Sequence, residues 1–320
     1  MQLRVLAPPN SSPARRLPPW LKRPLPGGRD FAETRLAVVR SGVATVCEDA
    51  RCPNRTECWS RRTATFMILG HKCTRRCHYC SVETARPDPP QADEPERLAR
   101  AVEELGLRHV VVTSVARDDL PDEGAAQFAA CVWAIRRRSP GVTVEVLPPD
   151  LHARRELIRQ ICLAGPAIYN HNIEMVERLT PRFRPQGRYR RSLDVLRIVK
   201  ELRPELITKS GLMLGLGETR DELLQTFDDL RAAGCDVLTL GQYLTPTPAH
   251  APIARFYSPD EFDELAEIAR GRGFLSIAAG PFVRSSYNAA AVFNEIKRLR
   301  PNSSPRRHEG PEELSMENGE

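Results

Sequence analysis

The chain has 320 residues, of which 41% are hydrophobic and 28% are charged, and its formal net charge is +6. This length is sufficient for one large α/β domain or two small ones, and we expect one domain with extensions. No apolar run approaches the roughly 18 residues that a membrane-spanning helix needs, so we expect no membrane partner. Arginine runs such as Arg136-Arg137-Arg138 are more typical of solvated helix faces than of phosphate contacts. Because no nucleic-acid-binding motif accompanies them, we expect no nucleic-acid partner.

The first 30 residues are rich in arginine and proline and contain no acidic side chain before Asp30. Organelle transit peptides are also rich in arginine, but the prolines oppose the amphipathic helix that such peptides form. We therefore predict a cytoplasmic location, although import through residues 1–15 stays open. The same residues predict a disordered tip and an extended arm over residues 16–22, which Trp20 anchors on the domain surface. Residues 31–41 fit a short helix that Gly42 ends.

Nine cysteines are unevenly distributed along the chain. In a chain of this size, crowded cysteines indicate metal ligation in a reducing compartment rather than disulfides. Cys131, Cys162 and Cys235 are scattered, and we expect them to be inert core residues. The crowded group comprises Cys47, Cys52, Cys58, Cys73, Cys77 and Cys80.

Cys73, Cys77 and Cys80 form a C-x3-C-x2-C triplet just after an apolar run at residues 65–69. A structural zinc site normally has four protein ligands, and His78 would have to fold back on its own loop to be the fourth. A four-iron four-sulfur (4Fe-4S) cluster held by three thiolates keeps one iron open for a small ligand. We therefore predict such a cluster here, with inert thiols as the alternative.

Cys47, Cys52 and Cys58 form an earlier triplet with C-x4-C-x5-C spacing. It again supplies three thiolates, so one iron of a cubic cluster would lack a cysteine ligand. The spacing departs from the plant-type ferredoxin pattern at its second interval. Zinc is the alternative here, again without a clear fourth ligand.

The rest of the chain alternates short apolar runs with segments of helical periodicity. Helix starts are indicated by Thr219 with Glu222, by Ser258 before a proline, and by Asp93 with Glu96. Six or seven such repeats predict a parallel sheet, either closed into a barrel or open. The apolar runs cover residues 65–69, 109–115, 142–147, 167–170, 207–214, 237–240 and 274–278.

Polar residues near the ends of these predicted strands are candidates for ligand contacts, because ligands of parallel sheets bind at the carboxyl edge. Residues 215–218 do not match a G-x-G-x-x-G fingerprint, so we predict no nicotinamide dinucleotide. A simple strand-to-helix turn is the alternative for residues 215–218, and capping of a strand end is the alternative for residues 170–172. The candidates are Thr113, Ser114, Asn170, Asn172, Lys209 and Glu218.

The C-x3-C-x2-C spacing resembles the signature of the radical S-adenosylmethionine superfamily. Further motifs make the chain similar to the lipoyl synthase family from about Leu17 to Tyr287, and the two triplets with Arg284-Ser285-Ser286-Tyr287 are the most specific of them. The motifs lie at residues 47–59, 64–70, 73–77, 112–115, 117–120, 170–172, 209–218, 240–243 and 280–287.

The resemblance implies an α/β fold, a partial parallel (β/α)6-type TIM-like barrel with N-terminal and C-terminal extensions. Residues 1–62 would form the N-terminal arm and an auxiliary-cluster extension, and residues 63–280 the barrel. Residues 281–300 would carry the Arg-Ser-Ser-Tyr motif and a last helix. The polar residues 301–320 are expected to form a disordered tail.

The implied cofactors are two 4Fe-4S clusters and S-adenosylmethionine, with the six candidate residues above as contacts for the latter. Ser286 and Arg284 are the implied catalytic residues, and Arg284 and Tyr287 would position the carrier peptide or stabilise the site. Without the resemblance, Ser286 would be interpreted as a helix N-cap. The implied ligands are Cys73, Cys77 and Cys80 for the cluster that binds S-adenosylmethionine, and Cys47, Cys52, Cys58 and Ser286 for an auxiliary cluster.

The implied reaction belongs to lipoate biosynthesis and protein lipoylation, and it inserts two sulfur atoms at C6 and C8 of a protein-bound octanoyl-lysine. Those C–H bonds offer no acidity to a general base, so the cofactors of this sulfurtransferase must supply radical chemistry. A 5'-deoxyadenosyl radical would abstract hydrogen, and the carbon radical would take sulfide from the auxiliary cluster. The implied partners are octanoylated lipoyl domains of 2-oxoacid dehydrogenase E2 subunits or the glycine-cleavage H protein, an electron donor such as ferredoxin or flavodoxin, and an iron-sulfur carrier protein.

Three other kinds of protein compete with this interpretation. Another radical S-adenosylmethionine sulfur-inserting enzyme would share the second triplet, but it is not expected to combine the first triplet with Ser286. A non-enzymatic iron-sulfur electron carrier or sensor has no need of a large βα barrel. A degenerate paralogue is the hardest alternative to exclude.

Overall fold

A curved sheet of eight strands, in the order β1-β2-β5-β6-β7-β8-β9-β10, forms the centre of the protein. The computed structural model describes residues 17–22, 28–61, 63–287 and 289–299. From β2 to β10 all neighbouring strands are parallel, and only β1 runs antiparallel to its neighbour β2. Among the described strands, β10 pairs with β9 alone, so the barrel stays open. This confirms the predicted partial TIM-like barrel.

The apolar runs of the sequence become the parallel strands, while the short strands β1, β3 and β4 were not predicted. The sheet comprises β1 (Ala44–Thr45), β2 (Thr65–Ile68), β5 (His109–Ser114), β6 (Thr143–Leu147), β7 (Ile168–Asn170), β8 (Ile207–Leu214), β9 (Val237–Gln242) and β10 (Ser276–Gly280). A separate pair consists of β3 (Lys72–Cys73) and β4 (Glu83–Thr84).

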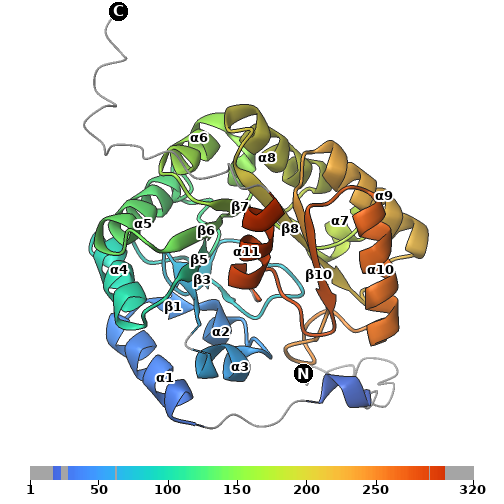
Figure 1. Ribbon diagram of the computed structural model, residues 1–320, viewed down its shortest axis with the longest axis horizontal. Coiled ribbons are helices and arrows are strands. Elements are labelled where there is room, and N and C mark those ends of the chain that lie inside the picture. Colours follow the sequence, from blue (N-terminus) through green and yellow to red (C-terminus); the bar gives the residue numbers. More distant parts are fainter. Residues whose placement is uncertain (1–16, 23–27, 62, 288, 300–320) are drawn as a thin grey trace, which may run out of the picture.

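Helices surround this sheet on its outer face, as Figure 1 shows for α4 to α6 and α8 to α10. The helices are α1 (Arg29–Ser41), α2 (Val46–Asp49), α3 (Arg55–Ser60), α4 (Glu94–Glu104), α5 (Ala125–Arg138), α6 (Arg155–Leu163), α7 (Thr180–Phe183), α8 (Tyr189–Leu202), α9 (Arg220–Ala232), α10 (Pro259–Gly271) and α11 (Ala289–Leu299). Short 3-10 turns are η1 (Pro19–Leu21), η2 (Leu151–Ala153) and η3 (Glu177–Leu179). Within the described residues, none of these helices is long and apolar enough to cross a membrane.

Two of the three predicted helix caps form as expected. Thr219 and Ser258 each make a complete capping box at the start of α9 and α10. At α4 the helix begins as predicted, but the side chain of Asp93 makes no cap, so that part of the prediction is wrong. Asp93 already has helical backbone angles (φ −89°, ψ −5°), whereas an N-cap residue normally has extended ones. Its carboxylate instead pairs with Arg97 at 3.1 Å.

Several local predictions are confirmed. Gly42 ends α1 in the left-handed conformation with φ 61°. The indole nitrogen of Trp20 donates to the carbonyl of Tyr257 at 3.2 Å and so anchors the N-terminal arm. The scattered cysteines Cys131, Cys162 and Cys235 are buried. The predicted disordered tip and tail lie outside the described residues, and the domain boundaries stay predictions.

Helix α11 closes the amino-terminal end of the barrel, and Figure 1 shows it across the middle of the sheet. Its apolar face packs on the first residues of three neighbouring strands, which leaves the carboxyl end of the barrel for a ligand. The contacting residues are Ile168, Ile207 and Val237 on the strands and Val292, Phe293 and Ile296 on the helix.

Candidate functional site

A cavity of about 530 Å³ is lined by the whole second cysteine triplet and by one cysteine of the first. Cys73, Cys77 and Cys80 all line it, and so do Cys52 of the first triplet and Ser286. It also reaches Ser114 and Gln242, the last residues of β5 and β9, so it occupies the carboxyl end of the barrel. All nine cysteines lie within the described residues, and none forms a disulfide. The site therefore offers thiols as metal ligands.

The loop that carries the second triplet is held in place by backbone groups. Cys73 ends β3, and its sulfur accepts hydrogen bonds from the backbone N–H groups of Arg75 at 3.4 Å and Ala116 at 3.3 Å. The N–H of Thr74 donates to the carbonyl of Ala116 at 3.1 Å. These contacts fasten the loop to the segment that follows β5. They leave Cys73 with N–H donors of the kind that tune the potential of an iron-sulfur cluster.

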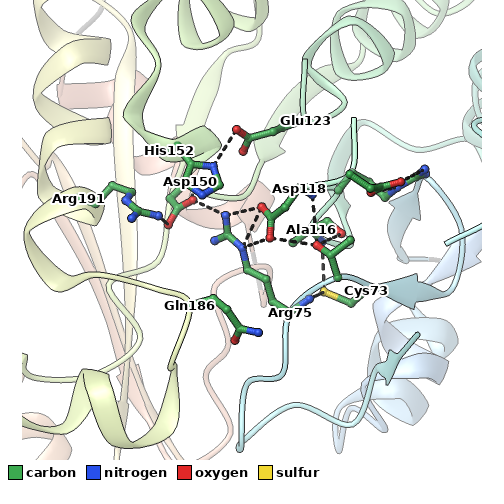
Figure 2. A network of polar contacts seen from close by, with 12 residues as sticks. Cys73, Arg75, Ala116, Asp118, Glu123, Asp150, His152, Gln186 and Arg191 are labelled. Carbon is green, nitrogen blue, oxygen red and sulfur yellow. Dashed lines mark hydrogen bonds and ion pairs between the residues drawn. The ribbon is translucent and has the colours of Figure 1, made fainter. Parts of the chain in front are cut away.

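Arg75 holds this loop through ion pairs with two carboxylates. Sequence analysis assigned no role to either of them. Figure 2 shows its guanidinium between Asp118 and Asp150, with N–O distances of 2.7 and 2.8 Å. Arg75 is only 5% exposed. Burial alone would raise the pKa of both carboxyl groups, but the guanidinium holds each pKa below its ordinary value. Both carboxylates are therefore ionised at neutral pH, and the loop is fixed before any cofactor binds.

Replacing Arg75 by methionine is expected to loosen the Cys73 loop. The variant should bind iron and labile sulfide at this triplet with about 10-fold lower affinity, since groups that orient metal ligands typically contribute that much. Iron and sulfide analysis after anaerobic reconstitution measures the effect. Arg76→Met is the matched control, because that side chain is exposed. Equal retention in the two variants would show that Arg75 does not position the loop.

Asp118, Glu123 and His152 also approach one another, with possible ligand atoms within 4.8 Å. Both carboxylates already have cationic partners, however. Arg75 pairs with Asp118, Arg154 lies 3.0 Å from Glu123, and His152 contacts the same Glu123 oxygen at 2.8 Å. Because the guanidinium groups neutralise the carboxylates, we assign no cation to this cluster.

Three of the six predicted cofactor contacts line the cavity. The hydroxyl of Thr113 donates to the carbonyl of Leu147 at 2.7 Å. Ser114 Oγ and Asn172 Oδ1 are buried and have no hydrogen-bond partner among the described residues. Buried polar atoms of this kind are normally satisfied, so both are suited to a polar ligand such as S-adenosylmethionine.

The other three predicted contacts do not line this cavity. Lys209 and Asn170 are fully buried and both bond to Glu145, with Nζ–Oε1 at 3.0 Å and Nδ2–Oε1 at 2.8 Å. Glu218 instead accepts from the backbone N–H groups of residues 215 and 216, at 2.6 and 2.9 Å. Glu218 therefore holds the strand-to-helix turn, which was the alternative considered for it.

Burial by itself would raise the pKa of Glu145, but the charge of Lys209 lowers it to about 2. The Glu145 carboxyl group is therefore ionised inside the barrel.

Arg184 and Tyr79 line the cavity although sequence analysis did not select them. Arg184 is 8% exposed and donates to Ser192 Oγ at 3.0 Å. Neither belongs to a strand end, so no strand-end rule could have found them.

His171 should make the stability of the protein depend on pH. Burial, followed by the nearby charge of Arg184, lowers the pKa of His171 to about 4, against an ordinary value of 6.5. The unfolded chain thus binds more protons between these values, and the free energy of unfolding should fall by about 3 kcal/mol as the pH drops from about 6.5 to about 4. Denaturant titrations at several pH values measure this slope.

The variant His171→Gln should lose that slope, whereas His71→Gln should keep it because the His71 side chain is 63% exposed. A slope that persists unchanged in His171→Gln would contradict the assignment.

Cys47 lies on α2, Cys58 lies on α3, and Cys52 lies in the loop between these helices. The segment that follows β10 packs against this region. Asn54 Nδ2 donates to the carbonyl of Phe282 at 2.6 Å, and Tyr287 Oη donates to Glu57 Oε1 at 2.8 Å. Gly241 of β9 lets this segment approach, because a Cβ there would lie 2.0 Å from the carbonyl oxygen of Val283. The segment that carries Ser286 is thus held beside the first triplet.

Ser286 shares a cavity with each of two cysteines of the first triplet. It lines the main cavity with Cys52, and it also lines a second cavity with Cys58. An N-cap directly precedes the first helical residue, whereas α11 begins at Ala289, three positions after Ser286. The N-cap alternative is therefore wrong.

The side-chain chemistry suits iron-sulfur clusters, because each triplet offers three thiols and Ser286 offers a hydroxyl group. Cys73, Cys77 and Cys80 line the main cavity together, whereas Cys52 and Cys58 line different cavities and Cys47 lines neither. Burial raises the pKa of Cys47 to about 11 and that of Cys80 to about 12. These thiols are therefore protonated at neutral pH in the absence of a cluster and must release their protons on binding iron.

Comparisons with known proteins show the family to which the chain belongs. A family model described as the radical SAM superfamily matches residues 67–230. The lipoyl synthase of Rubrobacter xylanophilus is 51% identical over 281 residues, which cover 88% of this chain and 88% of that protein. The lipoyl synthase of Halalkalibacterium halodurans is 51% identical over 283 residues, which cover 88% of this chain and 93% of that protein.

Among solved structures, Streptococcus suis SuiB bound to precursor peptide SuiA has a TM-score of 0.52 at 13% identity. The match covers 79% of this chain and 54% of SuiB, and at this identity it concerns the fold alone. The two lipoyl synthases, in contrast, match at half of all aligned positions over most of both chains. The chain therefore belongs to the lipoyl synthase family of the radical S-adenosylmethionine superfamily.

Proposed function

We propose that this chain inserts two sulfur atoms, at C6 and C8, into an octanoyl-lysine carried by a lipoyl-domain protein. One observation carries the proposal beyond family membership. The second triplet, Cys52 of the first triplet and Ser286 line a single cavity, so a substrate chain in that cavity would reach both donor sets. An electron carrier or sensor has no need of such a shared cavity.

Cys73, Cys77 and Cys80 hold the 4Fe-4S cluster that binds S-adenosylmethionine in this proposal. The second cluster would be held by Cys47, Cys52, Cys58 and Ser286. When bound, these groups supply radical chemistry for unactivated C–H bonds and the sulfur atoms that are inserted.

The side chains of the cavity perform the remaining tasks. Ser114 and Asn172 offer their unpartnered oxygens to the polar ends of S-adenosylmethionine. Arg75 keeps the cluster loop in a fixed position. Apolar side chains that include Met67, Leu147 and Leu212 line the same cavity and would accept an alkyl chain and exclude water from it.

The partners in this proposal follow from the substrate. The octanoylated carrier would be an E2 lipoyl domain of a 2-oxoacid dehydrogenase or the glycine-cleavage H protein. Ferredoxin or flavodoxin would deliver electrons, and an iron-sulfur carrier protein would restore the second cluster. The cytoplasmic location stays a prediction from the reduced cysteines.

Anaerobic mass spectrometry tests the proposal. The reconstituted protein is incubated with an octanoyl-lysine peptide, S-adenosylmethionine and a strong reductant, and deoxyadenosine is measured in the same sample. We expect two sulfur atoms to be added to the peptide. Deoxyadenosine with an unchanged peptide would retain the radical chemistry but refute this substrate, and neither product would refute the proposal altogether.

A further inference from the structure

A second cavity of about 430 Å³ lies at the other end of the barrel strands. His109 and Val111 of β5 line it, whereas Thr113, the next residue on the same face of β5, lines the main cavity. The second cavity also contacts the first turn of α11 at residues 289–291. The two cavities thus follow one another along the inner face of the barrel, and the second lies towards its amino-terminal end.

Ser286 stands between these two cavities, because it lines both of them. Cys52 lines only the main cavity, and Cys58 lines only the second one. The segment that carries Ser286 separates the two cavities. The hydrogen bond of 2.8 Å from Tyr287 to Glu57 holds this segment in place. A small molecule can therefore reach the first triplet from both cavities. It meets Cys52 in the main cavity and Cys58 in the second cavity.

The walls of the second cavity carry an excess of positive charge. Glu57 is balanced by Arg61, whose Nη1 lies 3.1 Å from Oε1. Arg108 is exposed and has no ion-pair partner among the residues that the structure describes. His109 is 8% exposed, and its Nδ1 makes no hydrogen bond to any described residue, while its Nε2 faces Glu145 at 3.4 Å. Arg108 leaves this partly buried cavity with one uncompensated positive charge among the described residues, and such a charge favours a small anion.

We propose that the second cavity binds a small sulfur anion, of the hydrosulfide or thiolate class, and gives it access to Cys58 and Ser286 without passage through the main cavity. This inference rests on the proposed function, in which Cys58 and Ser286 belong to the set that supplies sulfur. An alkyl substrate occupies the main cavity during that reaction. A separate route through the second cavity lets sulfur return to the ligand set of Cys58 and Ser286 while the octanoylated carrier protein is still bound at the main cavity.

Alkylation of the full-length, cluster-free chain tests this access. The anionic reagent iodoacetate and the neutral reagent iodoacetamide are compared, and peptide mass spectrometry measures the rate at Cys58, with Cys52 as the internal reference. The ratio of the two rates removes the effect of the thiol pKa, because both reagents attack the same thiolate. Arg108→Glu should lower this ratio at Cys58 by about 10-fold at low salt and leave it unchanged at Cys52.

Arg159→Glu is the matched control, because Arg159 is an exposed arginine of α6 that lines neither cavity. A second pair of variants tests the route itself. Ala291→Trp places a large side chain at the second cavity and should slow both reagents at Cys58 by about 10-fold, because alkylation depends on access. Asn294→Trp, on an exposed position of α11 away from the cavity, should have no such effect.

Equal slowing of Cys52 and Cys58 in Ala291→Trp, or no slowing of either, would overturn the proposal. An unchanged ratio of the two alkylation rates in Arg108→Glu would show that the second cavity does not favour an anion. Far-ultraviolet circular dichroism confirms that each variant is folded before it is compared. Because no product of sulfur insertion is measured, a negative result here is distinct from a failure of the proposed function.

Discussion

Ser286→Ala is expected to cleave S-adenosylmethionine at nearly the normal rate and to form the sulfur-containing product at least about 100-fold more slowly. The reason is the separation of the two donor sets. Cys73, Cys77 and Cys80 lie on a loop that Arg75 and Ala116 hold, and none of the hydrogen bonds found among the described residues joins Ser286 to that loop. Ser286 is the only residue of the Arg-Ser-Ser-Tyr motif that lines both cavities beside the first triplet together with Cys52 and Cys58.

Liquid chromatography with mass spectrometry measures deoxyadenosine and the modified peptide in one sample. Ser285→Ala is the comparison that identifies the ligand, because Ser285 lines only the main cavity, where its hydroxyl accepts from Asn172 at 3.3 Å. We expect Ser285→Ala to retain more sulfur insertion than Ser286→Ala. The reverse order, or full product formation by Ser286→Ala, would assign the fourth ligand elsewhere.

Lys209→Met is expected to destabilise the protein by about 3–5 kcal/mol, which is the usual cost of leaving one partner of a buried ion pair without the other. Glu145 and Lys209 are both fully buried, and their closest atoms are 3.0 Å apart. Without Lys209, Asn170 and His109 are the polar partners of the carboxylate that remain among the described residues. Its pKa should then rise, because burial is no longer opposed by the lysine charge.

Guanidinium unfolding of the cluster-free protein measures the loss. Arg220→Met removes one member of an exposed pair with Glu264 and should change stability little. The double variant Lys209→Met with Glu145→Leu should recover much of the loss, since no unpaired charge stays buried. A loss in Lys209→Met no larger than in Arg220→Met would show that the pair is not desolvated as the structure indicates.

The parallel strands and the crowding of the cysteines were predictable because each leaves a local signal. A buried parallel strand is rich in apolar residues, and β2 (TFMI) and β5 (HVVVTS) are of that kind. A capping box places both its partners within four residues, as at Thr219. Thiols crowded around Cys77 have few explanations other than a metal. These features depend on neighbours in the chain and so can be seen without the fold.

The pairing of distant polar groups was not predictable in the same way. Lys209 precedes the end of its predicted run, but it is only the third residue of β8, well before the carboxyl end at Leu214. Its partner Glu145 lies 64 positions earlier, in β6. The apolar run that contains Glu145 predicts a buried strand and gives no sign of the ion pair. Arg75 and Asp150 are likewise 75 positions apart. Such pairs are determined by which strands become neighbours, and periodicity alone does not show that.

The contact between Tyr287 and Glu57 joins residues 230 positions apart, which has a consequence for biosynthesis. At roughly 5–20 residues per second, translation needs roughly 10–50 s to travel from one partner to the other. The Cys73 loop and its carboxylate anchors are translated in the first half of that interval. The surroundings of the two cysteine triplets can therefore form in a fixed order, and those of the first triplet, beside Ser286, are completed only when the polypeptide is nearly finished.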